Sequence, residues 1–172
     1  EHAGQPALAA GSACVDMTAG VGGSTAALAR AFCSVVAYET DAARFGHLRR
    51  NLKAWGLSGR VHCLCEDSVA AVLAGDGAAG LPLPAAMLDP PWGGIHYRHR
   101  GGVQLMLSGF RLPELVPRLA QSISVLGLKV PLGWDYEGFL ALLPPGLVAG
   151  CSMRRIGRQR LLCLKLLRGA LR

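Results

Sequence analysis

Apolar residues follow two patterns along this chain: short continuous runs, and longer stretches in which apolar positions lie three or four residues apart. Short bounded runs are typical of strands buried in a parallel sheet. Such runs predict five strands, at residues 14–17, 35–38, 61–65, 85–88 and 125–130. Because helical or loop segments separate these runs, the sequence favours an α/β fold with a doubly wound, mostly parallel sheet covered by helices on both faces.

Helical spacing is clearest between the second and third strands. Four residues there fall on one stripe, which predicts a surface packed into the core: Phe45, Leu48, Leu52 and Trp55. Gly56 is placed to end this helix, and the basic residues between the apolar positions take its solvent face. The helix before it carries Leu28 and Phe32, and Ser24 or Thr25 offers its N-cap.

Two apolar runs close the sequence, at 147–153 and 161–167, with a basic connection between them. They fit a terminal antiparallel hairpin, which gives a sheet of seven strands with an antiparallel last strand. That arrangement is the methyltransferase variant of the doubly wound fold. We expect residues 1–172 to form one domain, with residues 1–13 as the remnant of an N-terminal extension.

A glycine-rich turn separates the first strand from the first helix. Glycine at such a turn lets a ligand approach the backbone, although a plain tight turn has the same composition. The spacing of Gly20, Gly22 and Gly23 differs from the GxGxxG pattern of NAD sites, and Asp16 would repel a pyrophosphate but attract an ammonium group. We interpret the turn as a cofactor site formed by Asp16, Thr18, Gly20 and Gly22.

Acidic residues also end the next two strands. Glu39 follows the second strand, where a carboxylate can accept both hydroxyls of a ribose, and Asp41 is close enough to replace it. Asp67 follows the third strand, where its carboxylate could accept from an adenine amino group. A single strand-end acid is commonly a solvated charge, but Asp16, Glu39 and Asp67 in succession outline S-adenosylmethionine as the cofactor.

The fourth strand ends in Asp89-Pro90-Pro91-Trp92, followed by two glycines. The lone pair of an exocyclic amino nitrogen is delocalised into its base, so the nitrogen is a poor nucleophile until acceptors hold both N–H bonds. The Asp89 carboxylate and the Pro90 carbonyl can be those acceptors, and Trp92 offers a face for stacking a flat base. We predict that Asp89, Pro90 and Trp92 are catalytic and that Asp89 also lines the cofactor site. A proline-stiffened turn with a core tryptophan is the alternative.

The segments VDMTAGVGG, AYETD, CED and DPPWGG, in this order, resemble the RNA cap guanine-N2 methyltransferases, the trimethylguanosine synthase group. Leu107–Phe110 and Lys129–Pro131 also look like segments of that family, so the resemblance runs from about Cys14 to about Leu143. It implies a class I methyltransferase fold, S-adenosylmethionine as donor, a 7-methylguanosine cap as acceptor, and Trp92 as the residue that stacks on the cap.

Two departures from that family keep other substrates open. Asp89 stands where the family typically has Ser, and Asp begins related motifs in enzymes that methylate guanine in ribosomal RNA or adenine in DNA. The residues before the first strand are also fewer than in the family, which suggests a third hypothesis, a methyltransferase-like RNA-binding module without turnover.

Positive charge gathers near the end of the sequence. The net charge is +7, and residues 151–172 hold seven basic residues and no acidic one. Such a one-sided field is expected for a polyanionic partner such as RNA, although a solvated basic tail would look the same. The predicted substrate contacts are Trp92, Tyr97, Arg98, Arg100, Trp134, Arg155 and Arg158, with His96 and His99 as further candidates. For Trp134 a packing role is an equal alternative.

Six cysteines show no CxxC spacing, so we expect small core residues in a reducing compartment and no metal site. No apolar run reaches the roughly 18 residues needed to span a bilayer, and no signal peptide is visible. We therefore expect a monomeric protein of the nucleus or cytoplasm that has RNA, and no membrane or metal, as its partner.

Overall fold

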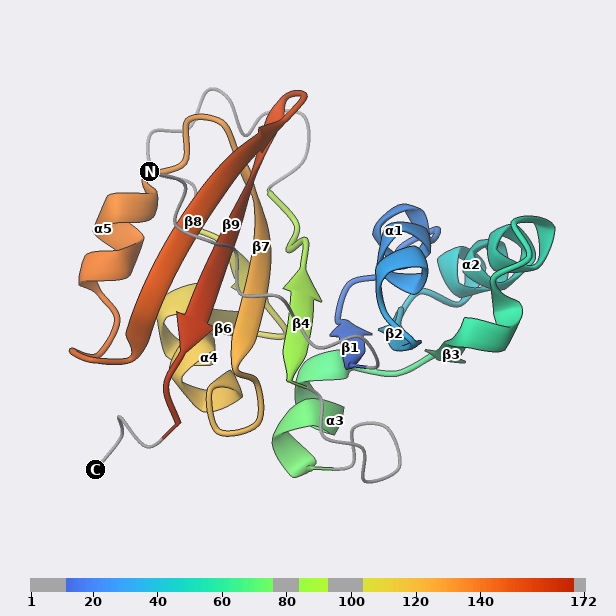
Figure 1. The fold of residues 1–172 in the computed structure, drawn as a ribbon, viewed down its shortest axis with the longest axis horizontal. Helices are drawn as coiled ribbons and strands as arrows, with labels where there is room; N and C mark the ends of the chain where they lie inside the picture. The colour runs from blue at the N-terminus through green and yellow to red at the C-terminus, as the bar shows by residue number, and fades with distance from the viewer. Residues whose placement is uncertain (1–11, 76–83, 93–103, 169–172) are drawn as a thin grey trace.

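The computed structural model describes residues 12–75, 84–92 and 104–168. A seven-stranded sheet runs through them in the order β3-β2-β1-β4-β7-β9-β8 (Figure 1). Its strands are β1 (Ala13–Asp16), β2 (Ser34–Tyr38), β3 (Val61–Leu64), β4 (Ala85–Leu88), β7 (Val125–Pro131), β8 (Val148–Ile156) and β9 (Gln159–Leu166). The first five of these pair in parallel, whereas β9 runs antiparallel to both of its neighbours. The fold predicted from the apolar runs is confirmed.

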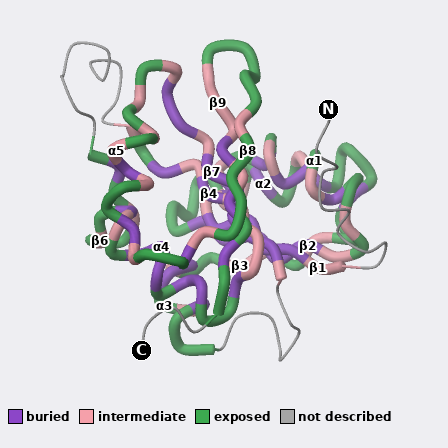
Figure 2. The backbone as a smooth tube through the Cα atoms, turned by 60° about the vertical axis from the view of Figure 1, so that its left-hand side comes forward, coloured by how far each residue is buried: buried purple, intermediate pink, exposed green. Residues whose placement is uncertain are grey.

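Helices cover both faces of this sheet, and each face has its own apolar cluster. The helices are α1 (Gly23–Ala31), α2 (Ala42–Ala54), α3 (Ser68–Ala74), α4 (Leu112–Leu119) and α5 (Tyr136–Ala141), with a 3-10 turn at Ser58–Arg60. Residues of α1 and α2 pack with one cluster, and residues of α3, α4 and α5 pack with the other. Figure 1 shows the two groups of helices apart, and Figure 2 shows the buried backbone between them.

The central strands are buried because both of their faces are covered. In β2, Val35 and Ala37 join the cluster under α1 and α2, whereas Val36 and Tyr38 join the opposite cluster. Side chains of a strand alternate between faces, so a strand between two helical layers must be apolar throughout. This requirement explains why short continuous runs, without alternation, predicted these strands correctly.

Three predictions about individual residues are wrong. The N-cap of α1 is Gly22, with a φ of 102°, and neither Ser24 nor Thr25. The Thr25 hydroxyl donates to the buried Asp16 carboxylate instead. Trp55, expected in the core, is 44% exposed, because it lies at the C-cap of α2 beyond the buried Leu48 and Leu52. The cysteines are not uniformly core residues: Cys14 is buried, but the exposed ones are Cys33, Cys65 and Cys151.

A small hairpin that the sequence analysis did not predict stands before α4. It consists of β5 (Met106–Leu107) and β6 (Phe110–Arg111), joined by Ser108 and Gly109 with φ values of 49° and 82°. Positive φ at both central residues is the geometry of a tight hairpin turn, which tolerates glycine and only some other residues. Within the described residues, no helix is both long and apolar enough to cross a membrane.

The order in which strands are added reverses between β1 and β4, because β2 and β3 lie on one side of this pair and β7 lies on the other. Ligands of open α/β sheets bind at such a switch point, beyond the carboxyl ends of the strands. β1 ends at Asp16, and Asp89 directly follows the end of β4. The topology therefore brings the glycine turn and the Asp-Pro-Pro-Trp segment to one edge.

Candidate active site

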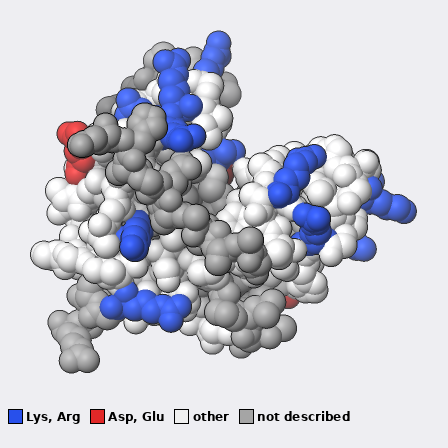
Figure 3. Space-filling model, in the orientation of Figure 1, with Lys and Arg blue, Asp and Glu red and all other residues white. Residues whose placement is uncertain are grey.

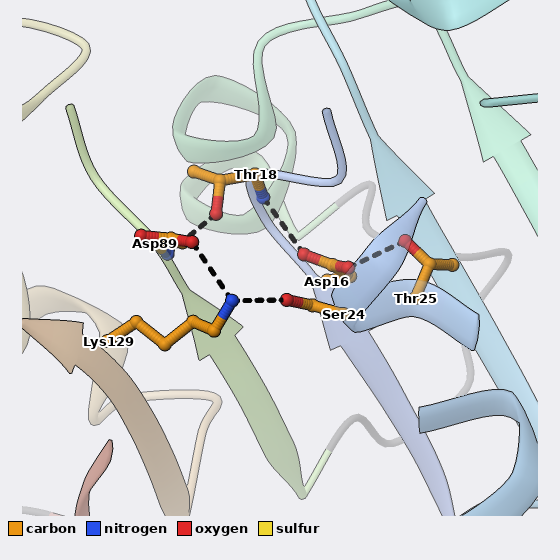
Figure 4. A network of polar contacts seen from close by, with 6 residues as sticks. All are labelled: Asp16, Thr18, Ser24, Thr25, Asp89 and Lys129. Atoms are coloured by element: carbon orange, nitrogen blue, oxygen red, sulfur yellow. Dashed lines mark hydrogen bonds and ion pairs between the residues drawn. The ribbon is translucent and has the colours of Figure 1, made fainter. Parts of the chain in front are cut away.

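Asp16 is the buried centre of the glycine turn. Its Oδ2 accepts a hydrogen bond of 2.7 Å from the Thr25 hydroxyl, and its Oδ1 accepts one of 3.2 Å from the Thr18 backbone N–H (Figure 4). The side chain is 0% exposed, and burial raises its pKa to about 6 although both threonines and Lys129 oppose the rise. The Asp16 carboxylate therefore holds the glycine turn and the first turns of α1 together. Its contact with a cofactor ammonium group stays a prediction.

Thr18 joins this turn to Asp89. The Asp89 backbone N–H donates to the Thr18 hydroxyl over 2.7 Å, while the Thr18 backbone N–H points to Asp16. Two predicted cofactor residues and the backbone of the predicted catalytic Asp89 thus form one hydrogen-bonded unit, although Thr18 and Asp89 are separated by 71 positions in the sequence. A rigid link of this kind fixes the first residue of the Asp-Pro-Pro-Trp segment relative to the glycine turn.

Lys129, which the sequence analysis did not assign to the site, completes the network. Its ammonium group lies 3.1 Å from Asp89 Oδ2 and 3.0 Å from the Ser24 hydroxyl (Figure 4). β4 and β7 pair with Leu88 opposite Leu128, so the next residues, Asp89 and Lys129, stand side by side. The pair is partly exposed, with side-chain exposures of 31% and 22% for Asp89 and Lys129. A cation therefore faces the carboxylate at the mouth of the site.

Glu39 lies across the turn from this network. Its Oε2 accepts from the Gly20 backbone N–H over 2.9 Å, and its Oε1 accepts from the Asp41 backbone N–H over 2.8 Å. Asp41, the alternative ribose ligand, instead caps α2 by accepting from the Arg44 backbone N–H over 2.8 Å. The structure thus brings Glu39 to the glycine turn and gives Asp41 a separate structural task.

Asp67 caps the helix that follows β3. Its Oδ1 accepts from the backbone N–H groups of Val69 and Ala70, over 2.8 and 3.0 Å. Burial raises its pKa, but these hydrogen bonds and one from the Ser108 side chain outweigh that effect and hold the pKa below its ordinary value. The adjoining Ser68 hydroxyl donates to the Met17 carbonyl over 2.7 Å, which ties α3 to the glycine turn.

The glycines of the turn have different surroundings. Gly20 has a φ of 56°, and a Cβ at this position would meet no other heavy atom within 4 Å. Gly22 has a φ of 102°, and a Cβ there would come within 2.9 Å of Leu48 Cδ1. Gly22 is therefore required by packing against α2, whereas Gly20 borders open space in which a ligand could approach the backbone.

Two tryptophans predicted to contact the methyl-accepting base, Trp92 and Trp134, lie within the described residues. Pro90 is buried, and Trp92 is half-buried against the cluster of α3, α4 and α5. Trp134 packs against the same cluster, with its ring centroid 5.0 Å from that of Phe139. The remaining predicted or candidate contacts of this segment lie outside the described residues, namely His96, Tyr97, Arg98, His99 and Arg100.

The two predicted arginines lie at the turn between β8 and β9. Gln159 pairs with Pro131, the last residue of β7, so this turn emerges at the edge where β4 and β7 end. Arg155 and Arg158 are exposed there, and Arg155 Nε donates to the Gly157 carbonyl over 3.0 Å. Within the described residues, no three His, Cys, Asp or Glu side chains gather closely enough to hold a metal ion.

With this geometry in place, comparisons with known proteins identify the family. The sequence profile of the RNA cap guanine-N2 methyltransferases matches residues 11–129, well over half of the chain. The chain belongs to this family. An uncharacterised protein of Acanthamoeba polyphaga mimivirus is 29% identical over 126 residues, which cover 72% of this chain and 48% of that protein. The chain thus spans about half the length of the curated relative it matches.

Solved structures share the fold of this RNA cap guanine-N2 methyltransferase family member. An rRNA methylase from Streptococcus thermophilus superposes with a TM-score of 0.60 at 17% identity, covering 92% of this chain and 88% of that one. The T. thermophilus 16S rRNA N2 methyltransferase RsmC, solved with AdoMet and guanosine, gives a TM-score of 0.64 at 21% identity, covering 91% and 38%. The methyltransferase family and fold support S-adenosylmethionine as the cofactor, as the sequence predicted.

Proposed function

We propose that this domain transfers a methyl group from S-adenosylmethionine to the exocyclic N2 amine of a guanine in RNA, and that the acceptor is a 7-methylguanosine cap. The observation that carries the proposal is the position of Asp89 directly before Pro90, where Thr18 holds its backbone N–H at the glycine turn and Lys129 holds its carboxylate. Membership of the RNA cap guanine-N2 methyltransferase family supports the same reaction.

Asp89 acts as the acceptor that holds an N–H bond of the substrate amine. Lys129 engages Oδ2, which orients the carboxylate and leaves Oδ1 as the oxygen for the amine. The Pro90 carbonyl is the second acceptor, and the two prolines restrict its direction. Both acceptors favour a pyramidal nitrogen whose lone pair is available for attack. Asp89 orients the amine and has no need to take a proton before transfer, since the amine becomes acidic only once its lone pair is used.

The residues at the glycine turn fit S-adenosylmethionine. Open space borders Gly20, and the buried Glu39 carboxylate beside it retains lone pairs for ribose hydroxyls, because each of its oxygens accepts one hydrogen bond from the described residues. We assign Asp67 to the adenine amino group and Asp16, through Thr18, to the shape of the turn. When bound, S-adenosylmethionine supplies a methyl group that passes from sulfur to nitrogen as the carbon–sulfur bond breaks.

Trp92 stacks on the acceptor base in this proposal. It directly follows the two prolines, so its ring is carried beside the Pro90 carbonyl. Methylation at N7 gives guanine a positive charge, which adds a cation–π attraction of about 0.5–2 kcal/mol to ordinary stacking on an indole. That difference is the physical basis for preferring a methylated cap over unmodified guanine. Arg155 and Arg158 hold RNA phosphates at the same edge.

A methyl-transfer assay with radiolabelled S-adenosylmethionine tests the proposal. The acceptors are capped RNA, the same RNA without a cap, a guanine-containing ribosomal RNA fragment, and DNA. We expect transfer to capped RNA, and Asp89→Ala should lower turnover far more than it lowers cofactor affinity, which is measured by calorimetry. Asp89→Ser should retain some activity, because Ser is typical at this position of the family.

The same assay decides between the alternatives. If only uncapped or ribosomal RNA is methylated, the substrate is an internal guanine and not the cap. Asp89 also fits that substrate. Transfer to adenine in DNA would refute the guanine-N2 assignment. Binding of RNA by a folded protein that neither binds S-adenosylmethionine nor methylates any acceptor would identify an RNA-binding module without turnover.

A further inference from the structure

A basic pocket lies away from the proposed active site, between α2 and the edge strand β3. It has a volume of about 600 Å³, and the lining side chains come from α2, from the 3-10 turn and from β3. They are Phe45, Arg49, Arg50, Leu52, Lys53, Ser58, Val61 and Cys63, with Gly46 at the helix backbone. Three of these residues are cations and none is acidic.

The segment that lines the pocket contains no acidic residue to offset this positive charge. Residues 42–65 contain five basic residues and no acidic one. Neither of the ion pairs found among the described residues involves Arg49, Arg50 or Lys53. Burial raises the pKa of Cys63, so its thiol stays neutral beside Arg49. Figure 3 shows Lys and Arg side chains gathered over the lobe that carries α1 and α2.

The pocket combines this charge with an aromatic ring and an open sheet edge. The Arg49 guanidinium carbon lies 6.0 Å from the centroid of the Phe45 ring, which holds the cation over an apolar floor. Among the described strands β3 is the outermost of its side of the sheet, so one side of its backbone has no partner among them. Cations, an aromatic face and backbone N–H groups are together the contacts that proteins use for phosphates and unpaired bases.

From these observations we propose that the α2–β3 pocket binds the phosphodiester backbone of the RNA substrate, at nucleotides distant from the one that is methylated. This inference rests on the proposed function for the identity of the substrate. β3 is three strands from β4, which is about 14 Å at about 4.8 Å per strand spacing. One nucleotide at Asp89 does not reach both places, so the RNA must continue past the acceptor.

α2 is firmly attached to the cofactor side of the site. The Asn51 side-chain amide donates to the Val21 carbonyl over 2.8 Å, and Leu48 packs beside Gly22. The inner face of α2 therefore contacts the glycine turn, while its outer face carries the cations of the pocket. RNA held on that outer face has a fixed position relative to the cofactor, and this helps to deliver the acceptor nucleotide in one orientation.

The test compares two double variants with the same change of charge. Arg49→Gln with Lys53→Gln neutralises the pocket. Lys165→Gln with Arg168→Gln neutralises two exposed cations at the carboxyl end of β9, in the half of the sheet away from β3, and is the matched control. Binding of a fluorescein-labelled single-stranded RNA is measured by anisotropy between 0.05 and 0.5 M salt, about the range in which counterion release dominates. Circular dichroism and thermal melting confirm that all proteins are folded.

The pocket variant should show a salt dependence that is flatter by about 1.4, since each lost single-strand phosphate contact removes about 0.7 from the slope. With an unchanged intercept at 1 M salt, its Kd at 0.1 M should rise about 25-fold, or about 5-fold for each contact. The control variant should keep the wild-type slope. Methyl transfer to a cap dinucleotide should be equal in all three proteins, whereas transfer to longer capped RNA should fall only in the pocket variant.

Several results would overturn the inference. Equal weakening in both double variants would assign the effect to overall charge, and an unchanged slope in the pocket variant would remove the phosphate contacts. Binding of polyglutamate, but not RNA, that depends on the pocket would indicate an acidic protein segment as the occupant. If no acceptor is methylated but RNA binding still depends on the pocket, the proposed function fails and the pocket assignment stands.

Discussion

The buried carboxyl group of Asp16 gives the free energy of unfolding a pH dependence that one substitution can isolate. Asp16 has a folded-state pKa of about 6, compared with 3.8 for the unperturbed group, because burial disfavours its charged form. Thr25, Thr18 and Lys129 lower the pKa, and the Asp89 charge raises it. The folded state therefore prefers the neutral acid more strongly than the unfolded chain does.

The sign of the effect follows from this preference. A group whose folded pKa is raised contributes stability that is fully present below pH 3.8 and is lost as the pH rises through about 6. Between pH 4.5 and pH 7.5 the two pKa values correspond to a loss of about 2 kcal/mol, at about 1.4 kcal/mol per pKa unit. Net stabilities of domains are about 5–15 kcal/mol, so this loss is large enough to measure.

Asp16→Asn removes the ionisation, and urea unfolding at pH 4.5 and pH 7.5 measures its effect. The hydrogen bonds altered by Asn change stability by the same amount at both pH values, so the pH dependence of the difference reports ionisation alone. Wild type should lose about 2 kcal/mol relative to Asp16→Asn as the pH rises. Glu66→Gln, which removes an exposed carboxylate, is the control and should behave like wild type. A difference between wild type and Asp16→Asn that is equal at both pH values would refute the reasoning.

Four further predictions concern the proposed reaction. Glu39→Ala should weaken S-adenosylmethionine binding by about 1.5–3 kcal/mol in calorimetry, and an unchanged Kd would exclude the ribose contact. Lys129→Met should lower kcat by about 10-fold or more, about the effect of one charged hydrogen bond, because the Asp89 carboxylate is then no longer held in one orientation; cofactor affinity should stay constant. A variant with the wild-type kcat would show that the ion pair does not contribute to turnover. Neutralising Arg155 and Arg158 should flatten the salt dependence of RNA binding by about 1.4, and an unaltered slope would mark them as a solvated surface. Trp92→Ala should lose about 1–3 kcal/mol of base stacking and most preference for a methylated cap, with Trp92→Phe keeping part of both; undiminished discrimination by a folded variant would contradict stacking.

The strand ends could be predicted from the sequence because the signal is local. Each parallel strand is a short apolar run, and an acidic residue marks its carboxyl edge, either as the last strand residue, as for Asp16, or directly after the strand, as for Glu39 and Asp89. Parallel connections return every such end to the same edge of the sheet. The sequence order alone therefore indicated which side chains gather, although it did not indicate which of their oxygens are already used by the protein.

The errors come from positions where tertiary packing overrides a local preference. Thr25 is a good N-cap by composition, but the buried Asp16 carboxylate needs its hydroxyl as a donor, and Gly22 starts the helix instead. Trp55 lies on the apolar stripe of α2, but the helix ends there and the side chain stays partly exposed. Asp41 and Asp67 also accept from backbone N–H groups at helix starts, a use of their oxygens that the sequence did not indicate, and their contacts with a ligand stay predictions.

The contact between Lys129 and Asp89 could not be predicted from the sequence. Lys129 lies inside an apolar strand, 40 positions from Asp89, and only the pairing of β4 with β7 places the two side by side. The pairing also bears on the departure from the family at position 89. A serine at this position offers a neutral hydroxyl as acceptor. An aspartate offers a negatively charged carboxylate, which attracts cations and can rotate unless a partner holds it. A lysine on the neighbouring strand offsets that charge and fixes one oxygen, so the aspartate and Lys129 are best understood as one unit.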